Sequence, residues 1–332
     1  MPASPRRILV APVSFKGTFT AAQVAQAIGR GLEAGGHPVD LCPVADGGEG
    51  TLEVLAGALD ARLESARVSD PLGRPIEAPF ALVEEGRGRT SAIVEAAAAI
   101  GLTLVSEGEL DPVAASTAGA GELIAAAVKA GADVVYVGVG GSATTDGGSG
   151  AIRVLRRAGG LGRSRVVVLC DVRTRFEDAA RVFGPQKGAT PADVKRLTRR
   201  LHGVARRLER DPRGVPMTGA AGGLSGGLWG AFGAELVPGA AVVLDLLEFD
   251  RRMRAAQAVV GGEGRLDQQS LAGKALSEVA TRARQAGVPC HAVVGRRELD
   301  SFGARILDLQ AVLEAGTLRQ IRAAGQRLAG LI

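Results

Sequence analysis

Short apolar runs and longer segments with helical spacing follow one another along the first part of the chain. Residues 7–12 form an apolar run, and residues 21–34 carry an apolar residue at every third or fourth position. Thr20 is placed as the N-cap of that predicted helix. A second apolar run at 39–44 leads into the polar loop ADGGEGT and another short helix. The order strand, polar glycine loop, helix, repeated twice, predicts a parallel α/β sheet.

The pattern changes near Ala61, where apolar residues begin to alternate with polar ones. Residues 76–82 alternate, and EEGRGR predicts a hairpin turn before a strand at 90–95. The remaining predicted elements are helices at 119–131, 190–210, 277–286 and from 317, with strands at 134–139, 165–170, 258–261 and 289–294. Because the strand–helix order of the beginning returns from residue 258, we interpret the middle of the chain as a domain inserted into an α/β domain.

Length and composition agree with this interpretation. A chain of 332 residues exceeds one typical domain, and 46% hydrophobic residues can form a large core. Only 3% of the residues are aromatic, so the core is built from Ala, Val and Leu, which favours α/β layers over an aromatic-rich β-sandwich.

The net charge of +5 and the pI near 9.5 raise the question of nucleic-acid binding. The basic residues follow predicted helical faces, as in RRLHGVARRLER, and no aromatic side chains lie between them to stack on bases. This pattern is typical of a solvated helix face, so we expect no nucleic-acid partner. Only five of the 40 basic residues are lysines: Lys16, Lys129, Lys187, Lys195 and Lys274. Three of these five adjoin a glycine, as lysines in tight phosphate-binding loops do.

The cysteine positions and the hydropathy of the chain indicate where in the cell the protein is located. Cys42, Cys170 and Cys290 are widely spaced, and each lies in or beside an apolar run. We therefore expect buried free thiols in a reducing compartment, with no zinc site. The chain shows no signal-peptide pattern and no uninterrupted apolar stretch of 18 residues, so we expect a cytoplasmic protein without membrane spans.

The glycine-rich stretch at 134–150, VVYVGVGGSATTDGGSG, is the clearest candidate for ligand binding. An apolar run ends in glycines that let a ligand approach the backbone. Ser142, Thr144, Thr145 and Asp146 then offer hydroxyl groups and a carboxylate. The stretch predicts a phosphate-binding loop at the carboxyl end of a strand. The alternative is a tight connection whose glycines serve packing alone.

Six loops combine glycine or a strand end with charge, and most of them follow apolar runs. They are SFKG at 14–17, ADGGEGT at 45–51, GGSATTDGG at 140–148, CDV at 170–172, FGPQKGAT at 183–190 and GEGRLDQQSLAGK at 262–274. Because loops at strand ends meet at one edge of a sheet, a shared site is the simplest hypothesis. Their lysines and carboxylates match the needs of phosphoryl transfer, although any single carboxylate also suits a turn cap.

Two other enzyme classes fit less well. The chain has no GxxxxGK[ST] motif, which excludes a P-loop enzyme. GVGGSA matches the dinucleotide pattern GxGxxA, but no acidic residue closes a strand about twenty residues later. His37, His202 and His291 form no pattern that predicts a nucleophilic triad.

The chain resembles the bacterial glycerate kinase family, the one without the MOFRL domain. The resemblance covers nearly the whole length and rests on these motifs in order: APVSFKGTFTA, PVADGGEGT, GVGGSATTDGG, CDV, VFGPQKGAT, GAAGGLSGGL, GAEL and GEGRLDQQSLAGK. It implies phosphorylation of D-glycerate with ATP and Mg²⁺, giving 2-phosphoglycerate. It also implies a flavodoxin/Rossmann-like parallel-sheet domain, formed by 1–66 and 255–332, interrupted by an inserted α/β (α+β-like) domain at 67–254. The active site would lie in the crevice between the two domains.

The resemblance also suggests roles for individual residues. Asp171 would be the base, and Lys16 and Lys187 would act on the ATP phosphates. Substrate and phosphate contacts would come from Ser14, Lys16, Gly17, Gly47, Gly48, Gly140, Gly141, Ser142, Thr144, Arg265 and Lys274. The metal ligands would be drawn from Asp46, Glu49, Asp146, Glu263 and Asp267. The oligomeric state stays open between a monomer and a homodimer.

Three departures from the family pattern bear on activity. Val13 stands where the first motif usually has Asp, residues 156–164 replace a longer segment, and RTRF at 173–176 replaces NPL. Losing a carboxylate at a catalytic site removes a metal ligand or a substrate hydrogen bond. The alternative to a glycerate kinase is therefore a kinase-fold protein with lost or altered activity. A nicotinamide enzyme at GVGGSA is a third hypothesis.

Overall fold

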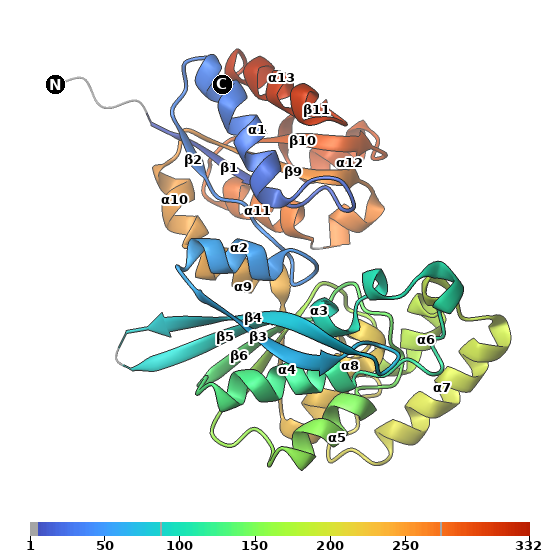
Figure 1. Ribbon diagram of the computed structural model, residues 1–332. Helices are drawn as coiled ribbons and strands as arrows, with labels where there is room; N and C mark the ends of the chain where they lie inside the picture. The colour runs from blue at the N-terminus through green and yellow to red at the C-terminus, as the bar shows by residue number, and fades with distance from the viewer. Residues whose placement is uncertain (1–5, 87, 273) are drawn as a thin grey trace. The chain divides into compact units, whose positions relative to one another are not determined.

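The computed structural model describes residues 6–86, 88–272 and 274–332, and the chain divides into two compact units (Figure 1). Unit 1 comprises Met1–Asp46 and Ala240–Ile332, and unit 2 comprises Gly47–Gly239. The expected boundaries at 66/67 and 254/255 thus fall at 46/47 and 239/240.

Local pairing explains both differences. In unit 2, the strand at 62–69 pairs antiparallel with the next strand, so the segment from Gly47 joins that sheet. In unit 1, Arg282 makes ion pairs to Asp245 at 2.6 Å and to Asp250 at 3.3 Å, which ties the segment after 240 to the C-terminal part of the chain. The two ends of the inserted stretch are therefore set by strand pairing on one side and by ion pairs on the other.

Unit 1 is built around five parallel strands. Its strands are β1 (Ile8–Pro12), β2 (Val39–Leu41), β9 (Ala258–Leu266), β10 (Cys290–Arg297) and β11 (Leu309–Glu314). Its helices are α1 (Ala21–Ala34), α10 (Phe249–Ala255), α11 (Ala275–Gln285), α12 (Ser301–Ile306) and α13 (Leu318–Ala329), with α9 (Gly239–Leu246) at the boundary. The strand order β11-β10-β9-β1-β2 is the flavodoxin-like order, with its topological switch between β1 and β9.

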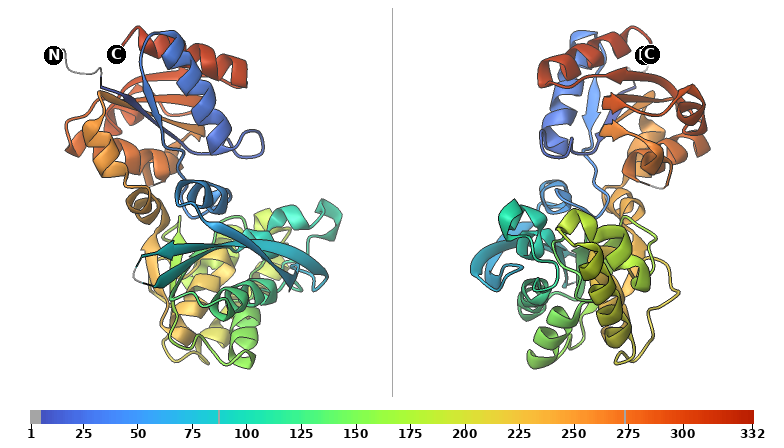
Figure 2. Two further views of the ribbon diagram at one scale, coloured as in Figure 1. Left: turned by 60° about the vertical axis from the view of Figure 1, so that its left-hand side comes forward. Right: turned by 90° about the vertical axis from the view of Figure 1, so that its right-hand side faces the viewer.

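Helices cover both faces of the unit 1 sheet. α1 and α13 lie side by side on one face (Figure 2), where Val24, Ile28 and Ile321 join Val10 in the core. α11 packs against β9 and β10. The α1 N-terminus is fixed by a capping box, in which Thr20 and Gln23 accept each other's backbone N–H groups.

Unit 2 contains a six-stranded mixed sheet in the order β3-β4-β5-β6-β7-β8. Its strands are β3 (Arg62–Ser69), β4 (Pro75–Glu85), β5 (Arg89–Glu95), β6 (Val134–Gly138), β7 (Arg165–Cys170) and β8 (Glu235–Pro238). Its helices are α2 (Thr51–Ala58), α3 (Ala97–Ile100), α4 (Ala118–Lys129), α5 (Ser149–Arg157), α6 (Ala179–Phe183), α7 (Pro191–Ala205) and α8 (Ala220–Phe232). β3, β4 and β5 pair antiparallel, and β5 to β8 pair parallel.

The core of unit 2 consists of small and branched aliphatic side chains. Helices α4, α5 and α8 contribute Leu123, Leu155 and Leu224 to one cluster with strand residues such as Val135 and Val168. α2 packs against β4 and β5, and the half-buried Glu95 carboxylate of β5 accepts hydrogen bonds from backbone N–H groups at the α2 N-terminus. The prediction of α/β layers is confirmed, although Phe80 lies in this cluster and the buried Phe176 lies in a smaller one.

Most predicted elements are present, with shifted ends. The helix expected at 190–210 ends at Ala205, and the strand expected at 258–261 continues to Leu266. β8 and β11 were not predicted, because both are short runs of only partly buried and exposed residues. Cys42, Cys170 and Cys290 are buried free thiols, as expected. Among the described residues, no helix is both long and apolar enough to cross a membrane.

Candidate active site

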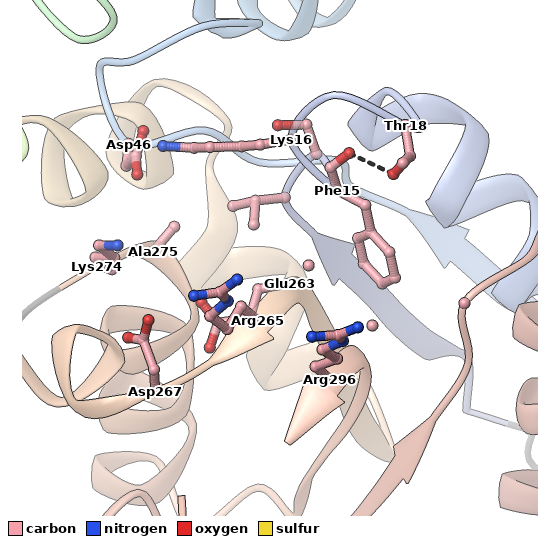
Figure 3. Close-up of a pocket in the computed structure, with 15 residues that line it drawn as sticks. Phe15, Lys16, Thr18, Asp46, Glu263, Arg265, Asp267, Lys274, Ala275 and Arg296 are labelled. Carbon is pink, nitrogen blue, oxygen red and sulfur yellow. Dashed lines mark hydrogen bonds between the residues drawn. The ribbon is translucent and has the colours of Figure 1, made fainter. Parts of the chain in front are cut away.

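The larger candidate cavity lies in unit 1 at the topological switch point of the sheet. It has a volume of about 580 Å³, within the usual range for small-molecule pockets. Its walls are the segment that follows β1 and the carboxyl ends of β9 and β10 (Figure 3). The lining residues are Val13, Ser14, Phe15, Lys16, Thr18, Asp46, Glu263, Gly264, Arg265, Asp267, Lys274, Ala275, Gly295, Arg296 and Gly316. Open parallel sheets bind their ligands at this point.

Glycines let the three backbone segments of this cavity approach closely. A β-carbon at Gly295 would lie 2.4 Å from the Gly264 carbonyl oxygen, and one at Gly264 would lie 3.3 Å from the Phe15 Cα. Contacts below 3 Å exclude any side chain. Gly295 at the end of β10 is therefore needed to form the wall, Gly264 of β9 eases the close approach to Phe15, and the wall in turn presents backbone to a ligand.

Charged side chains of both signs surround the cavity. Figure 3 shows Lys16 extending toward Asp46, while Arg265, Asp267 and Lys274 lie on the segment from the end of β9 to the start of α11. Arg265 also pairs with the exposed Glu298 at 3.4 Å. This mixture can bind an anion through its cations and a cation through its carboxylates.

Glu263 is the buried acidic group of this cavity. Its side chain is only 6% exposed, and its Oε1 has no hydrogen-bond partner. Burial raises the pKa of Glu263 from 4.5 to about 7, and the Ser270 hydroxyl and the Lys274 charge oppose that rise. An unpartnered buried oxygen in a ligand cavity is a vacant acceptor for a substrate hydroxyl or a metal ion.

A smaller cavity, of about 100 Å³, lies within unit 2. Gly140, Gly141 and Ser142 of the loop after β6 form one wall, and Gln186 and Lys187 form another. Asp171, directly after β7, also lines it. The remaining lining residues are Leu102, Val139, Val172, Phe183 and Ala221. The prediction of loops meeting at strand ends is confirmed for this group.

Asp146 organises the loop that forms the first wall. It is fully buried, and its Oδ2 accepts hydrogen bonds from the Thr117 N–H, the Thr117 hydroxyl and the Gly150 N–H, each at 3.0 Å. Its Oδ1 accepts the Gly148 N–H at 3.0 Å. These donors compensate the burial of the carboxylate and occupy both of its oxygens. These contacts give Asp146 a structural role in the loop.

Lys187 bridges the two walls. Its Nζ donates hydrogen bonds to the Ser142 Oγ at 3.1 Å and to the Thr144 carbonyl oxygen at 2.6 Å. Burial lowers the pKa of Lys187 from 10.5 to about 7, although the nearby Asp146 carboxylate opposes that fall. A lysine with this pKa is half protonated at neutral pH, so an arriving phosphate would shift it to the charged form.

The start of α8 packs against the loop at 140–148. Ala221, Gly222 and Gly223 are consecutively left-handed, with φ values of 49°, 62° and 91°. A β-carbon at Gly222 would lie 2.0 Å from the Thr144 carbonyl oxygen, so only glycine fits there. Gly222 in turn accepts the Gly147 N–H at 3.0 Å. The GAAGG sequence is thus explained by close packing against the GGSATTDGG loop.

The other predicted residues occupy varied positions. Gly17 has a φ of +76° in the turn between Phe15 and Phe19 and does not line the unit 1 cavity. Gly47 packs against Leu169, and a β-carbon at Gly140 would lie 2.5 Å from the Gly48 Cα. Glu49 is exposed and lines neither cavity. The Thr144 hydroxyl is fully buried and has no hydrogen-bond partner.

Sequence reasoning missed several lining residues. Gly295 and Arg296 follow the buried part of β10, so the strand-end rule applied to that strand would have identified them. Ala221 and Gln186 lie inside motifs that the sequence analysis had noted, but nothing in their side chains pointed to a cavity.

Comparison with known proteins identifies the family. The model of the "Glycerate kinase family" matches residues 8–158 and 156–317 of this chain. A glycerate kinase of Halalkalibacterium halodurans is 36% identical, with 87% of this chain and 85% of the relative covered. The glycerate 2-kinase of Escherichia coli is 34% identical with the same coverage. A crystal structure from Salmonella typhimurium LT2, assigned provisionally as glycerate kinase 2, matches with a TM-score of 0.83 at 31% identity, over 99% of this chain and 98% of that one.

The chain belongs to the glycerate kinase family. It is accordingly a kinase with small-molecule substrates, and the expected two-domain α/β fold is confirmed. The two segments matched by the family model meet at 156–158, which is where the sequence analysis placed a shortened segment.

The acidic residues of this glycerate kinase family member bear on metal binding. Among the described residues, no three His, Cys, Asp or Glu side chains converge as a metal-binding group. Magnesium in kinases usually takes one or two carboxylates and completes its shell with water and substrate phosphates. Asp46, Glu263 and Asp267 line one cavity and can supply that smaller number.

Replacing Glu263 with Gln should change the pH dependence of stability. Between about pH 4.5 and pH 7, the folded wild type keeps the Glu263 proton while the unfolded chain releases it, so this group makes folding less favourable as pH rises. The resulting loss in the free energy of unfolding reaches its full size above the folded pKa of about 7, where it is up to about 3 kcal/mol. Glu263→Gln should therefore gain stability relative to wild type at pH 8 but not at pH 4.5.

Urea unfolding of both proteins at the two pH values measures this difference. Glu298→Gln is a control, because the Glu298 carboxylate is exposed. A stability difference between wild type and Glu263→Gln that is the same at both pH values would contradict a raised pKa.

Proposed function

We propose that this enzyme transfers the γ-phosphoryl group of ATP to the 2-hydroxyl group of D-glycerate, giving 2-phosphoglycerate and ADP. The observation that carries the proposal is the similarity to curated glycerate kinases over 87% of the chain, including one named a glycerate 2-kinase. The chemistry of the two cavities agrees with it.

The unit 2 cavity suits the phosphates of the donor. Gly140 and Gly141 expose backbone, and the Ser142 hydroxyl and the Lys187 ammonium offer further donors. Phosphoryl transfer needs such donors because negative charge is spread over the oxygens of the transferred group. We assign the phosphate chain of ATP to this cavity.

The unit 1 cavity suits a small hydroxy acid. Arg265 and Lys274 can pair with the carboxylate of glycerate, and Ser14 can hydrogen-bond to a hydroxyl group. Lys16 lines the same cavity and can contact the phosphoryl group during transfer. Phosphoryl transfer joins the acceptor hydroxyl directly to the γ-phosphorus, so a cation such as Lys16 can stabilise the negative charge of the transferred group.

The acidic residues divide between proton transfer and metal binding. We assign Asp171 as the base that accepts the proton of the 2-hydroxyl group. Glu263, Asp46 and Asp267 would hold Mg²⁺, whose charge would neutralise the phosphate oxygens. The vacant Oε1 of Glu263 is the acceptor best suited to that role.

A coupled assay tests the reaction. ADP release should require D-glycerate and Mg²⁺, and Asp171→Asn should lower kcat by about a hundredfold or more. Phosphorus NMR of the product distinguishes 2-phosphoglycerate from 3-phosphoglycerate. The Glu49→Gln variant is a control, because Glu49 is an exposed acidic residue that lines neither cavity. No ADP release with D-glycerate or related hydroxy acids would falsify the proposal.

Donor binding should bring a proton to Lys187. At pH 8 the Lys187 amine is mostly neutral, because its pKa is about 7. Phosphate oxygens beside the amine favour its charged form, so binding of the ATP analogue AMP-PNP should take up close to one proton. Calorimetric titration in buffers of different ionisation enthalpy measures that uptake.

The Lys187→Met variant should lose this proton uptake, whereas Lys195→Met should keep it, because Lys195 is exposed on α7. Equal uptake by both variants would show that another group titrates.

Val13 decides between full and altered activity. Its backbone N–H donates to the Gly262 carbonyl at 2.9 Å, and its side chain lines the unit 1 cavity beside Lys16. The family pattern would place an Asp at this position, so the cavity of this chain has one carboxylate fewer beside its cations. The alternative to the proposal is that this loss has weakened or abolished turnover.

Val13→Asp should raise the KM for D-glycerate about tenfold, because a new carboxylate would compete with the substrate carboxylate for the same cations. Val13→Asn is the matched control, since it has the shape of Asp without the charge. If wild type is inactive and Val13→Asp restores turnover, the alternative of lost activity is correct.

A further inference from the structure

A second, strongly basic concavity lies in unit 2 between α5 and α7, the helices labelled in the lower part of Figure 1. We call it the arginine groove. It has a volume of about 730 Å³ and a floor that includes Ile152, Val204 and Leu208. Its six charged lining residues are Arg153, Arg156, Arg157, Arg199, Arg200 and Arg207.

The groove concentrates positive charge. Among the described residues, the one carboxylate in an ion pair with these arginines is Glu209, 3.9 Å from Arg156 and 76% exposed. Six arginines and this glutamate leave a formal charge of +5, as large as the net charge of the whole chain. Concave surfaces with one sign of charge raise the local concentration of oppositely charged ligands.

Helical spacing directs the arginines toward one another. Arg153, Arg156 and Arg157 are three and four residues apart on α5, so they share a face of that helix. Arg199 lies on α7, Arg207 lies just past the end of that helix, and both line the same groove from the other side. Solvated helix faces usually carry mixed charges, since like charges at this spacing repel. The sequence analysis expected a solvated face, and the structure shows the α7 arginines facing a second arginine cluster.

One guanidinium is already held in place. Arg200 is half-buried, and its Nη1 donates to the Val113 carbonyl oxygen at 2.8 Å. Guanidinium groups offer paired N–H donors that match phosphate oxygens, and five other guanidinium groups line the same groove.

The lining also limits the kind of anion. It includes no aromatic residue, so nothing offers a stacking surface for nucleobases. The volume lies in the range of small-molecule sites. We propose that the arginine groove binds a small anion that carries two or more phosphate groups, recognised through its phosphates.

This site is separate from the proposed active site. None of its lining residues lines the unit 1 cavity or the smaller unit 2 cavity. The proposal therefore stands or falls independently of the glycerate reaction.

Calorimetric titration of the full chain with inorganic tripolyphosphate tests the proposal. The groove variant is Arg153→Gln, Arg199→Gln, Arg207→Gln. The control variant, Arg319→Gln, Arg322→Gln, Arg327→Gln, removes three exposed arginines of α13 and changes the net charge equally. Circular dichroism should show the same fold for both, because the substituted side chains are exposed.

Affinity for tripolyphosphate should fall at least about a hundredfold in the groove variant and less than about threefold in the control. Equal losses in the two variants would overturn the proposal, because the effect would then be one of net charge. Two further ligands test its chemistry. Citrate binding as tightly as tripolyphosphate would overturn phosphate recognition, and a single-stranded decathymidylate that binds more tightly than tripolyphosphate at the same ionic strength would identify a nucleic-acid surface instead.

Discussion

The candidate phosphate loop depends on the hydrogen bonds that the buried carboxylate of Asp146 accepts. A charged group inside a protein is tolerated only when donors replace its lost water. Here the donors are backbone N–H groups at Thr117, Gly148 and Gly150 and the Thr117 hydroxyl. The same contacts join the loop to the start of α4 and fix the entry to α5. Ser142 and the Thr144 carbonyl are thereby held where Lys187 can reach them.

Close backbone packing is the second constraint, and it explains why glycine is so frequent. A β-carbon at Gly148 would lie 3.2 Å from the Gly227 Cα, and one at Gly227 would lie 2.5 Å from the Gly147 carbonyl oxygen. The loop and α8 therefore touch through backbone, which leaves them little freedom to separate. A rigid support of this kind keeps the loop donors in position before a ligand binds. Many glycines of the family motifs thus act through packing, and only Gly140 and Gly141 of this loop reach the cavity itself.

The sequence was sufficient for the fold class, the family and most of the elements, because apolar runs followed by glycine loops leave few arrangements open. It could not separate roles within a loop. Asp146 and Lys187 both looked like site residues, yet the first is saturated by hydrogen bonds and the second faces a cavity, a difference that depends on contacts with distant segments. The boundaries between the two units could not be predicted from the sequence either, because they depend on β3 pairing with β4 and on the ion pairs of Arg282. The arginine groove could not be predicted for the same reason, since β7, α6 and the segment that contains Lys187 separate its two helices along the chain.

Each unit contains one ionisable group that burial brings to half protonation near neutral pH. The pKa of Glu263 rises to about 7 in unit 1, and that of Lys187 falls to about 7 in unit 2. Both shifts come mainly from lost hydration, so both make the folded state less stable than a neutral side chain would. Buried groups that serve stability alone are usually fully paired, whereas the Glu263 Oε1 is unpaired and Lys187 rests on a hydroxyl and a carbonyl without contacting an anion. A bound cation would provide a partner for Glu263, and a bound phosphate would provide one for Lys187. We propose that these two buried positions are the ones that respond when a phosphate donor and its metal ion bind.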